Sequence, residues 1–195
     1  MSALPKPKLT ALQYLAIERR AEFKSEFFDG EMFAMAGASS RHVFIASNLG
    51  LRLANALLGG PCRVGLSDLR VLVDRTGLYT YPDIVVVCGP GEYAPNDPDT
   101  LVNPTAIIEV LSPSTEKYDR GAKFRNYKRI ESLMEYVLVA QDEPLCERYV
   151  RQSDGAWGVV AYEGLHESLI FTSIPATVPL AEIYSGVEFP ATPTA

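Results

Sequence analysis

Apolar positions near the start of the chain recur with two periods, one typical of helices and one typical of strands. The run TALQ opens the segment 10–20 and fits a capping box followed by an apolar stripe, which predicts a helix. Asp29-Gly30 separates two aromatic-rich runs, and this dipeptide is a strong hairpin signal. The pattern therefore predicts an antiparallel pair in which 23–28 lies beside 31–36.

A longer helix and three strands are predicted from the next apolar runs. Apolar residues at helical spacing follow a pair of serines and stop at a Gly-Gly-Pro sequence, which predicts a helix over 41–58. Strand-like runs then cover 63–73, 83–88 and 105–111. In the first of these runs the apolar phase shifts near Ser67-Asp68, which indicates a bulge or bend.

The second half of the chain contains a predicted loop, a helix and further strands. Residues 88–104 are rich in proline, glycine and aspartate, which predicts a long exposed loop. A helix is expected over 114–130 and an alternating strand over 135–140. A C-terminal antiparallel β-meander is expected over three segments: 146–152, 156–163 and 168–171. This order predicts an α/β fold with a mixed central sheet, flanking helices and an N-terminal hairpin.

Length and composition are those of one ordinary globular domain. The 195 residues are 47% hydrophobic and 22% charged, so we expect a single domain over 1–195 with frayed ends at about 1–9 and 190–195. No run approaches the roughly 18 apolar residues of a membrane span, and the first lysines precede no apolar leader. We therefore expect a cytoplasmic protein with no membrane partner.

Charge, histidine and cysteine counts argue against several kinds of site. A net charge of −6 argues against indiscriminate polyanion binding, although a local basic patch can coexist with it. Two histidines are too few for a histidine-built metal cage, so a hard-metal site must use oxygen ligands. Cys62, Cys88 and Cys146 lack metal-site or disulfide spacing and are expected to be buried reduced thiols.

Two carboxylates occur where a buried strand would normally tolerate none. Asp83 opens an apolar run, and Glu109 lies inside the run AIIEVL. A lone ionised carboxylate in such a setting costs several kcal/mol unless it is paired, protonated or metal-bound. On neighbouring strands, both could reach one Mg²⁺ ion, which binds one or two carboxylates and water. The alternatives are that Asp83 caps a turn and that Glu109 pairs with a buried arginine such as Arg70.

The segment 112–129 adds cations beside these acids. At about 100° per residue, Arg120, Lys123 and Tyr127 fall on one side of the predicted helix. Lys123 can then reach back over the carboxylates, or it can form an (i, i+4) pair with Asp119. The other cations form either a functional basic stretch or a solvated helix face: Lys117, Arg125, Lys128 and Arg129.

Several motifs together resemble one nuclease family. The strongest is EVLSPST, which begins at Glu109 and is followed by DRGAK at 119–123 and then by Tyr127. Further matches are Glu26 with Asp29-Gly30, Ser40 with His42, Ser67-Asp68, Tyr81-Pro82-Asp83 and Glu135-Tyr136. On these motifs, residues 10–188 resemble the PD-(D/E)XK nuclease superfamily, which has the restriction endonuclease-like fold, and more narrowly the Uma-two family of endonucleases.

The resemblance implies a metal-dependent site and assigns its residues. Asp83, Glu109 and the Val110 carbonyl would bind Mg²⁺ or Mn²⁺. The superfamily places its lysine two residues after the second acid, where this chain has Leu111. Lys123 would serve instead, and would orient or deprotonate the attacking water. Supporting roles would fall to four residues: Glu26 and Asp68 in an outer acidic layer, His42 near the site and Tyr127 against the lysine.

The resemblance therefore implies an endonuclease that hydrolyses DNA with Mg²⁺. For His42, a hydrogen bond to backbone at the start of its helix is the favoured alternative. For the chain, one alternative is an inactive nuclease fold that binds nucleic acid or a protein partner, as Leu111 would allow. Another is a homodimeric scaffold that works through 88–104 and the meander, and a dimer would also suit a double-strand cutter. No recognised reading module distinguishes DNA from RNA.

Overall fold

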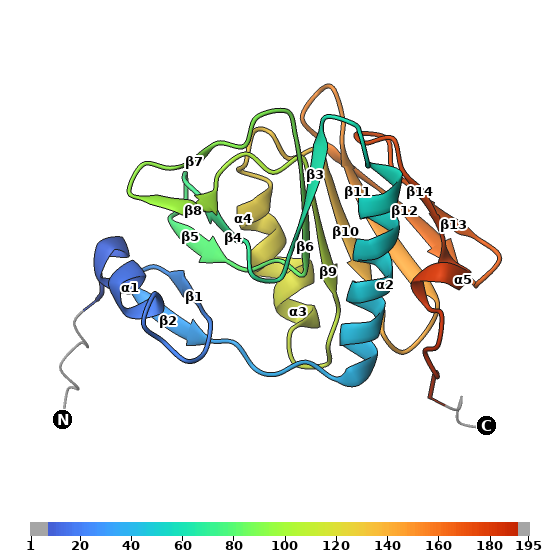
Figure 1. The fold of residues 1–195 in the computed structure, drawn as a ribbon, viewed down its shortest axis with the longest axis horizontal. Coiled ribbons are helices and arrows are strands. Elements are labelled where there is room, and N and C mark those ends of the chain that lie inside the picture. The colour runs from blue at the N-terminus through green and yellow to red at the C-terminus, as the bar shows by residue number, and fades with distance from the viewer. Residues whose placement is uncertain (1–7, 191–195) are drawn as a thin grey trace.

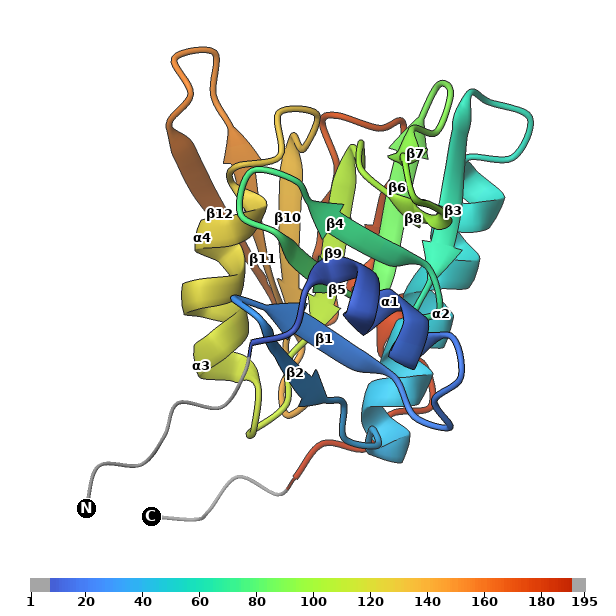
Figure 2. The same cartoon turned by 90° about the vertical axis from the view of Figure 1, so that its left-hand side faces the viewer.

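The computed structural model, which describes residues 8–190, contains two six-stranded sheets that pack against each other. The first sheet has the order β2-β1-β5-β4-β8-β7. Its strands are β1 (Ser25–Phe28), β2 (Glu31–Ala34), β4 (Arg70–Val73), β5 (Leu78–Thr80), β7 (Tyr93–Ala94) and β8 (Asp97–Leu101). Figure 2 shows this sheet in front of the second one, with α1 (Ala11–Glu18) packed on its outer face.

The second sheet separates two of the hydrophobic cores. It has the order β12-β11-β10-β9-β6-β3. Its strands are β3 (Cys62–Leu66), β6 (Ile84–Cys88), β9 (Ala106–Val110), β10 (Glu135–Val139), β11 (Leu145–Arg151) and β12 (Trp157–Glu163). β9 and β10 run parallel, and the other neighbours run antiparallel.

Helices cover both faces of this second sheet. One face carries α2 (Ser40–Ala56) and, beside it, the pair β13 (Ser168–Ile170) and β14 (Thr177–Pro179) with α5 (Leu180–Ile183), as Figure 1 shows. The other face packs on the first sheet and on α4 (Phe124–Tyr127). The predicted α/β class, with a mixed sheet, flanking helices and antiparallel C-terminal strands, is confirmed.

The predicted N-terminal elements are also confirmed. α1 begins with the predicted capping box, in which the Thr10 and Gln13 side chains each bond to the other residue's backbone amide. The turn between β1 and β2 has positive φ at both Asp29 (49°) and Gly30 (82°), which matches the right-handed twist of the paired strands. α2 is capped by Ser39 Oγ, which accepts a hydrogen bond from the His42 amide at 3.1 Å.

The single strand predicted over 63–73 is wrong, because the chain changes sheets in the middle of that range. β3 belongs to the second sheet and β4 to the first. A turn in which Leu69 N donates to Leu66 O (2.9 Å) redirects the backbone between them. The bend itself was predicted, but the change of sheet depends on pairing with distant strands, and β5 was not predicted for the same reason.

The predicted exposed loop 88–104 is wrong over its second half. β7 and β8 form one edge of the first sheet, and Asp97 in β8 is completely buried. Asp97 forms an ion pair with Arg70 and accepts a hydrogen bond from Thr100 Oγ1 at 2.6 Å. The composition of the segment did not reveal this because the partner, Arg70, comes from another strand.

Two further elements differ from the prediction. The helix expected over 114–130 is divided into α3 (Glu116–Tyr118), a π-helical segment η1 (Asp119–Lys123) and α4. The first two strands of the expected meander are present as β11 and β12, but β13 leaves that sheet and pairs with β14. α5 was not predicted.

The prediction of three reduced thiols is wrong for two of them. Cys62 and Cys88 form a disulfide with a Cα–Cα distance of 3.9 Å, whereas Cys146 is free and buried. The two bonded cysteines lie directly opposite each other in the antiparallel pair β3–β6. A separation of 26 residues in sequence gives no sign of that register.

The ends expected to fray, 1–9 and 190–195, lie mostly outside the described residues. Among the described residues of these ends, Leu9 N donates to Gly30 O at 2.9 Å, so Leu9 is held against the hairpin. Over 8–190, no helix combines the length and the apolar character that crossing a membrane requires.

Candidate active site

Asp83 and Glu109 lie opposite each other on neighbouring strands. β6 and β9 pair antiparallel with Ile84 opposite Ile108, so the next pair outward is Asp83 and Glu109. Directly opposed residues of an antiparallel pair project to the same face of the sheet. The Asp83 amide also approaches Glu109 Oε2 at 3.4 Å. The predicted convergence of the two acids at one edge is therefore present.

The Asp83 carboxylate is positioned by two donors. Its Oδ2 accepts a hydrogen bond from the Val110 amide at 2.7 Å, and its Oδ1 lies 2.9 Å from His42 Nε2. His42 comes from the first turn of α2, so this contact joins the helix to the start of β6. The favoured prediction for His42, a side chain bonded to backbone, is wrong: its amide donates to the helix cap, Ser39 Oγ, while its ring contacts Asp83.

Glu109 is buried and receives two donors on one oxygen. Tyr127 OH and Lys123 Nζ each lie 2.9 Å from Glu109 Oε1. Burial raises the pKa of Glu109 to about 8, and the negative charges of Asp83 and Asp119 add to the rise while Lys123 opposes it. The positive charge of Lys123 therefore does not offset the effects of burial and of repulsion on the Glu109 pKa.

Lys123 is the cation of the cluster and is shared by three carboxylates. Its Nζ lies 2.9 Å from Glu109, 3.1 Å from Glu26 and 3.6 Å from Asp119. Burial alone would lower the pKa of Lys123, but these carboxylates raise it well above its ordinary value. Both interpretations made for this lysine are therefore correct, since it reaches over Glu109 and also pairs with Asp119 at (i, i+4).

Glu26 joins the first sheet to this cluster. Its Oε1 accepts a hydrogen bond from Thr80 Oγ1, and its Oε2 accepts one from Tyr118 OH at 3.2 Å. Thr80 Oγ1 also lies 3.2 Å from Tyr127 OH, so the hydroxyl groups of Thr80 and Tyr127 connect Glu26 to Glu109. Thr80 and Tyr118 were not predicted as site residues, because Thr80 lies in the unpredicted β5 and Tyr118 carries no signal beyond its place beside the motif.

Asp68 and Arg120 are not part of this cluster in the described residues. The Asp68 side chain is 92% exposed and pairs with Lys24 at 2.9 Å. Arg120 pairs instead with Glu116 (2.8 Å) and Glu147. The prediction that Arg120 shares a side of the helix with Lys123 is wrong, because the π-helical segment departs from 100° per residue.

The alternative that Glu109 pairs with Arg70 is excluded. Arg70 pairs with Asp97 and donates to Thr100 Oγ1 (2.8 Å) and Tyr81 OH (2.6 Å). Leu111, at the position of the superfamily lysine, is buried in the core between the two sheets. Lys123 is therefore the lysine that contacts Glu109 in this chain.

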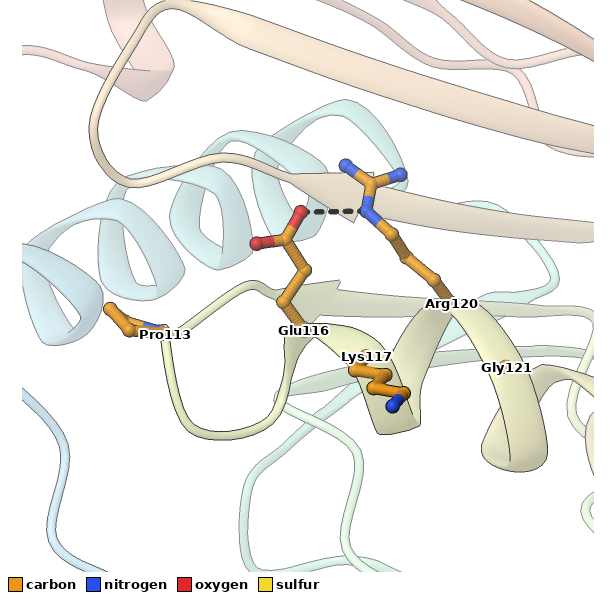
Figure 3. Close-up of a pocket in the computed structure, with 5 residues that line it drawn as sticks. All are labelled: Pro113, Glu116, Lys117, Arg120 and Gly121. Carbon is orange, nitrogen blue, oxygen red and sulfur yellow. Dashed lines mark hydrogen bonds and ion pairs between the residues drawn. The ribbon is translucent and has the colours of Figure 1, made fainter.

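A shallow hollow lies on the outer side of the same helical segment. It is lined by Pro113, Glu116, Lys117, Arg120 and Gly121, as Figure 3 shows. Glu116 and Arg120 neutralise each other across it, while the Lys117 side chain extends away from that pair. The hollow is separate from the buried carboxylates and leaves Lys117 accessible to a ligand.

The donor set fits a hard divalent cation bound by two carboxylates. Over residues 8–190, no group of three or more His, Cys, Asp or Glu side chains is arranged to hold a metal ion. Mg²⁺ does not need such a group, because it usually keeps several waters and binds through one or two carboxylates. Burial first and the charge of Asp83 second raise the pKa of Glu109, and a bound cation would neutralise the negative charges of the two acids.

Comparison with known proteins identifies similar sequences over nearly the whole chain. A family model named Uma2, described as "Putative restriction endonuclease", matches residues 11–181. The uncharacterized protein slr1290 of Synechocystis sp. is 38% identical over 185 residues, which cover 95% of this chain and 96% of the relative. A second Synechocystis protein, sll1609, is 33% identical over 164 residues, covering 84% of this chain and 93% of the relative.

A solved structure has the same fold. It is the crystal structure of "a putative nuclease belonging to DUF820" from Anabaena variabilis, with a TM-score of 0.74. The match covers 91% of this chain and 98% of that one at 18% sequence identity. At this identity the likeness establishes a shared fold, and it confirms the predicted architecture.

Proposed function

This chain belongs to the Uma2 family of restriction endonuclease-like proteins, and from that premise we propose that it is a Mg²⁺-dependent endonuclease that hydrolyses phosphodiester bonds in DNA. The observation that carries the proposal is the pairing of Asp83 with Glu109 across β6 and β9, with the Lys123 ammonium 2.9 Å from Glu109. Two acids and a lysine in this arrangement suit the attack of water on a phosphate.

Asp83, Glu109 and the Val110 carbonyl would hold the metal ion, which can be Mg²⁺ or Mn²⁺. When bound, such an ion lowers the pKa of water and offsets charge that develops at phosphorus. The Val110 amide and His42 hold the Asp83 carboxylate by its two oxygens. Tyr127 OH donates to Glu109 Oε1 at 2.9 Å. Fixed carboxylates limit the reorganisation that binding would otherwise require.

Lys123 would act as a fixed positive charge. The neighbouring carboxylates raise its pKa well above the ordinary value, which favours an orienting and charge-stabilising role over a proton-accepting one. A preorganised donor beside the reacting phosphate is worth most where water is excluded, and Lys123 is buried. Glu26 and Asp119 keep the ammonium in place at 3.1 Å and 3.6 Å.

A cleavage assay with matched carboxylate variants tests the proposal. Purified protein is incubated with plasmid, linear duplex and single-stranded DNA in Mg²⁺, in Mn²⁺ and in EDTA. We expect metal-dependent cleavage by the wild type and by Asp68→Asn, and at least a hundredfold slower cleavage by Asp83→Asn. Asp68 is the control because its exposed side chain lies outside the cluster. Cleavage by Asp83→Asn at the wild-type rate, or undiminished cleavage in EDTA, would contradict the assignment.

The second candidate function is an inactive nuclease fold that binds nucleic acid or a protein partner. The observation in its favour is Leu111, which is buried where the superfamily has its lysine. The same assay separates the two functions, because the inactive protein would cleave none of the substrates with either metal. Mn²⁺ binding measured by calorimetry on the wild type and Asp83→Asn then reports whether the acidic pair still binds a cation without cleavage.

A further inference from the structure

The hairpin that supplies Glu26 also places an exposed aromatic ring beside the cluster. Glu26 in β1 is directly opposite Phe33 in β2, so the two side chains project from the same face of the hairpin. Glu26 contacts Lys123 and Tyr118, so this face is the one turned toward the proposed active site. Phe33 is nevertheless 50% exposed, because β2 is the edge strand of its sheet.

Two more aromatic side chains extend this surface. Phe28 lies two residues after Glu26 in the same strand and therefore shares its face. Tyr118 donates to Glu26 and lies with its ring 5.8 Å from Lys123 Nζ. Both are 36% exposed. Single exposed apolar residues are common on proteins, but three partly exposed rings near Glu26 form a surface suited to flat, apolar ligand groups.

Unpaired cations lie on the helical segment that contributes Tyr118. Within residues 8–190, no carboxylate lies within ion-pair distance of the following side chains: Lys117, Arg125, Lys128 and Arg129. Arg120, in the same segment, is by contrast paired with both Glu116 and Glu147. Lys128 lies with its Nζ 4.9 Å from the Phe124 ring. In a chain with a net charge of −6, cations without a carboxylate partner on the segment that contributes Tyr118 complement a strongly anionic ligand.

From this combination we infer that the strand bound at the active site is single-stranded or locally unpaired nucleic acid. Its bases would stack on Phe33, Phe28 and Tyr118, and its phosphates would contact Lys117 and Arg125. In a duplex, neighbouring base pairs already cover the faces of the bases, so aromatic side chains gain stacking energy chiefly from unpaired ones. The inference rests on the proposed nuclease function and adds to it the paired state of the substrate.

Equilibrium binding in EDTA tests the inference without requiring cleavage. Fluorescence anisotropy is measured with labelled single-stranded DNA, with a duplex of the same length, and with a strand of the same length whose bases are removed. We expect the wild type to bind the intact single strand about 5- to 100-fold more tightly than the abasic strand, the range that stacking of one base provides. Equal affinity for intact and abasic strands would overturn the inference, as would tighter binding of the duplex.

Ring-specific variants identify the surface. We expect Phe33→Leu to bind the intact strand about 5- to 100-fold more weakly, with little change for the abasic strand, and Phe33→Trp to bind like the wild type. The matched control is Tyr93→Leu, because Tyr93 is 48% exposed at the opposite edge of the same sheet. Unchanged affinity in Phe33→Leu, or an equal loss in Tyr93→Leu, would contradict the stacking surface.

Two additional readouts separate stacking from charge and from catalysis. A 2-aminopurine base in the strand should be quenched on binding by the wild type and by Phe33→Trp more strongly than by Phe33→Leu, which lacks one of the three rings. A Lys117→Ala, Arg125→Ala double variant should reduce the slope of log Kd against log salt by about 0.7 for each lost phosphate contact. If the strand stacks and no DNA is cleaved, the nuclease proposal fails alone; if DNA is cleaved without base-dependent binding, this inference fails alone.

Discussion

The buried charges around Arg70 and those around Lys123 differ in how completely they are balanced. Arg70 has one buried carboxylate, Asp97, which also pairs with Arg19 at 3.1 Å. Burial alone would raise the pKa of Asp97, but the hydrogen bond from Thr100 and those from the two arginines lower it to about 2. Every charge in this group has a partner, as a structural ion pair inside a protein requires.

The Lys123 cluster has the opposite balance. One ammonium is shared by Glu26, Glu109 and Asp119, and the nearby Asp83 contacts His42 and the Val110 amide. Within residues 8–190, Asp83 has no lysine or arginine at ion-pair distance. The pKa of Glu109 is raised to about 8, in contrast to the lowered pKa of Asp97. The comparison teaches that burial of charge does not by itself indicate a functional site. An excess of charge of one sign in a buried cluster is the better indication of a functional site, because folding alone gives no reason to keep it.

The largest expected effect concerns the balanced cluster. Asp97→Ala leaves the buried Arg70 without its buried partner, and we expect it to lower the free energy of unfolding by about 3–5 kcal/mol. Urea denaturation followed by circular dichroism measures this change. The control is Asp142→Ala, which removes an exposed partner of Arg41 and should cost at most about 1 kcal/mol. Equal costs for the two variants would mean that the Arg70 cluster does not stabilise the fold.

Loss of the lysine from the unbalanced cluster should lower the rate of DNA cleavage. We expect Lys123→Met to lower kcat by about 10²- to 10³-fold, because it removes the positive charge beside Glu109. Initial rates of DNA cleavage at saturating substrate measure the effect. Lys8→Met is the control, since Lys8 forms an exposed ion pair with Asp29. A Lys123→Met enzyme with the wild-type kcat would show that the ammonium has a structural role like that of Arg70.

The sequence revealed one of these clusters and concealed the other for physical reasons. Asp83 and Glu109 interrupt apolar strands, and a carboxylate in such a run is a local signal that needs no knowledge of the fold. Lys123 was found from its place in a motif close to Glu109. Asp97, in contrast, lies in a run rich in proline and aspartate, and its burial depends on Arg70 from another strand.

The remaining errors also come from contacts between distant segments. Glu26 was assigned from the resemblance, but Thr80 and Tyr118 join the site only because the first sheet packs on the second. The predicted position of Arg120 beside Lys123 is wrong because 100° per residue holds for an ideal α-helix, whereas the structure has a π-helical segment there. His42 could be placed near the site from its motif, but its contact with Asp83 depends on how α2 packs against the sheet.

Removal of the histidine at Asp83 should have an intermediate effect. His42 would act as a positioning residue, so we expect His42→Ala to weaken Mn²⁺ binding about 10- to 100-fold. Calorimetric titration measures the affinity directly, without a need for activity. His166→Ala is the control, because that side chain is 82% exposed and pairs with its neighbour Glu167. Unchanged Mn²⁺ affinity in His42→Ala would mean that Asp83 does not depend on this contact for its orientation.

The smallest expected effect is the change in the free energy of unfolding with pH. It is also the most direct test of the difference between the two clusters. Asp97 has its pKa lowered from 3.8 to about 2, so its stabilisation is present above pH 3.8 and is lost as the pH falls toward 2. Glu109 has its pKa raised from 4.5 to about 8, so between these values the folded state keeps a proton that the unfolded state has released. Glu109 therefore makes the metal-free protein less stable as the pH rises from 4.5 to 8.

The slope should not exceed about 1.4 kcal/mol per pH unit for this one proton. The slope is measured by urea denaturation of the wild type and of Glu109→Gln in EDTA, between pH 5 and pH 8. The difference between the two slopes reports Glu109, because the variant has no proton to lose at that position. Asp119, whose pKa is raised chiefly by burial, contributes with the same sign in both proteins. Saturating Mg²⁺ should flatten the wild-type slope, since the cation would replace the proton on Glu109. Equal slopes for both proteins in EDTA would place the proton elsewhere and remove the distinction between the two clusters.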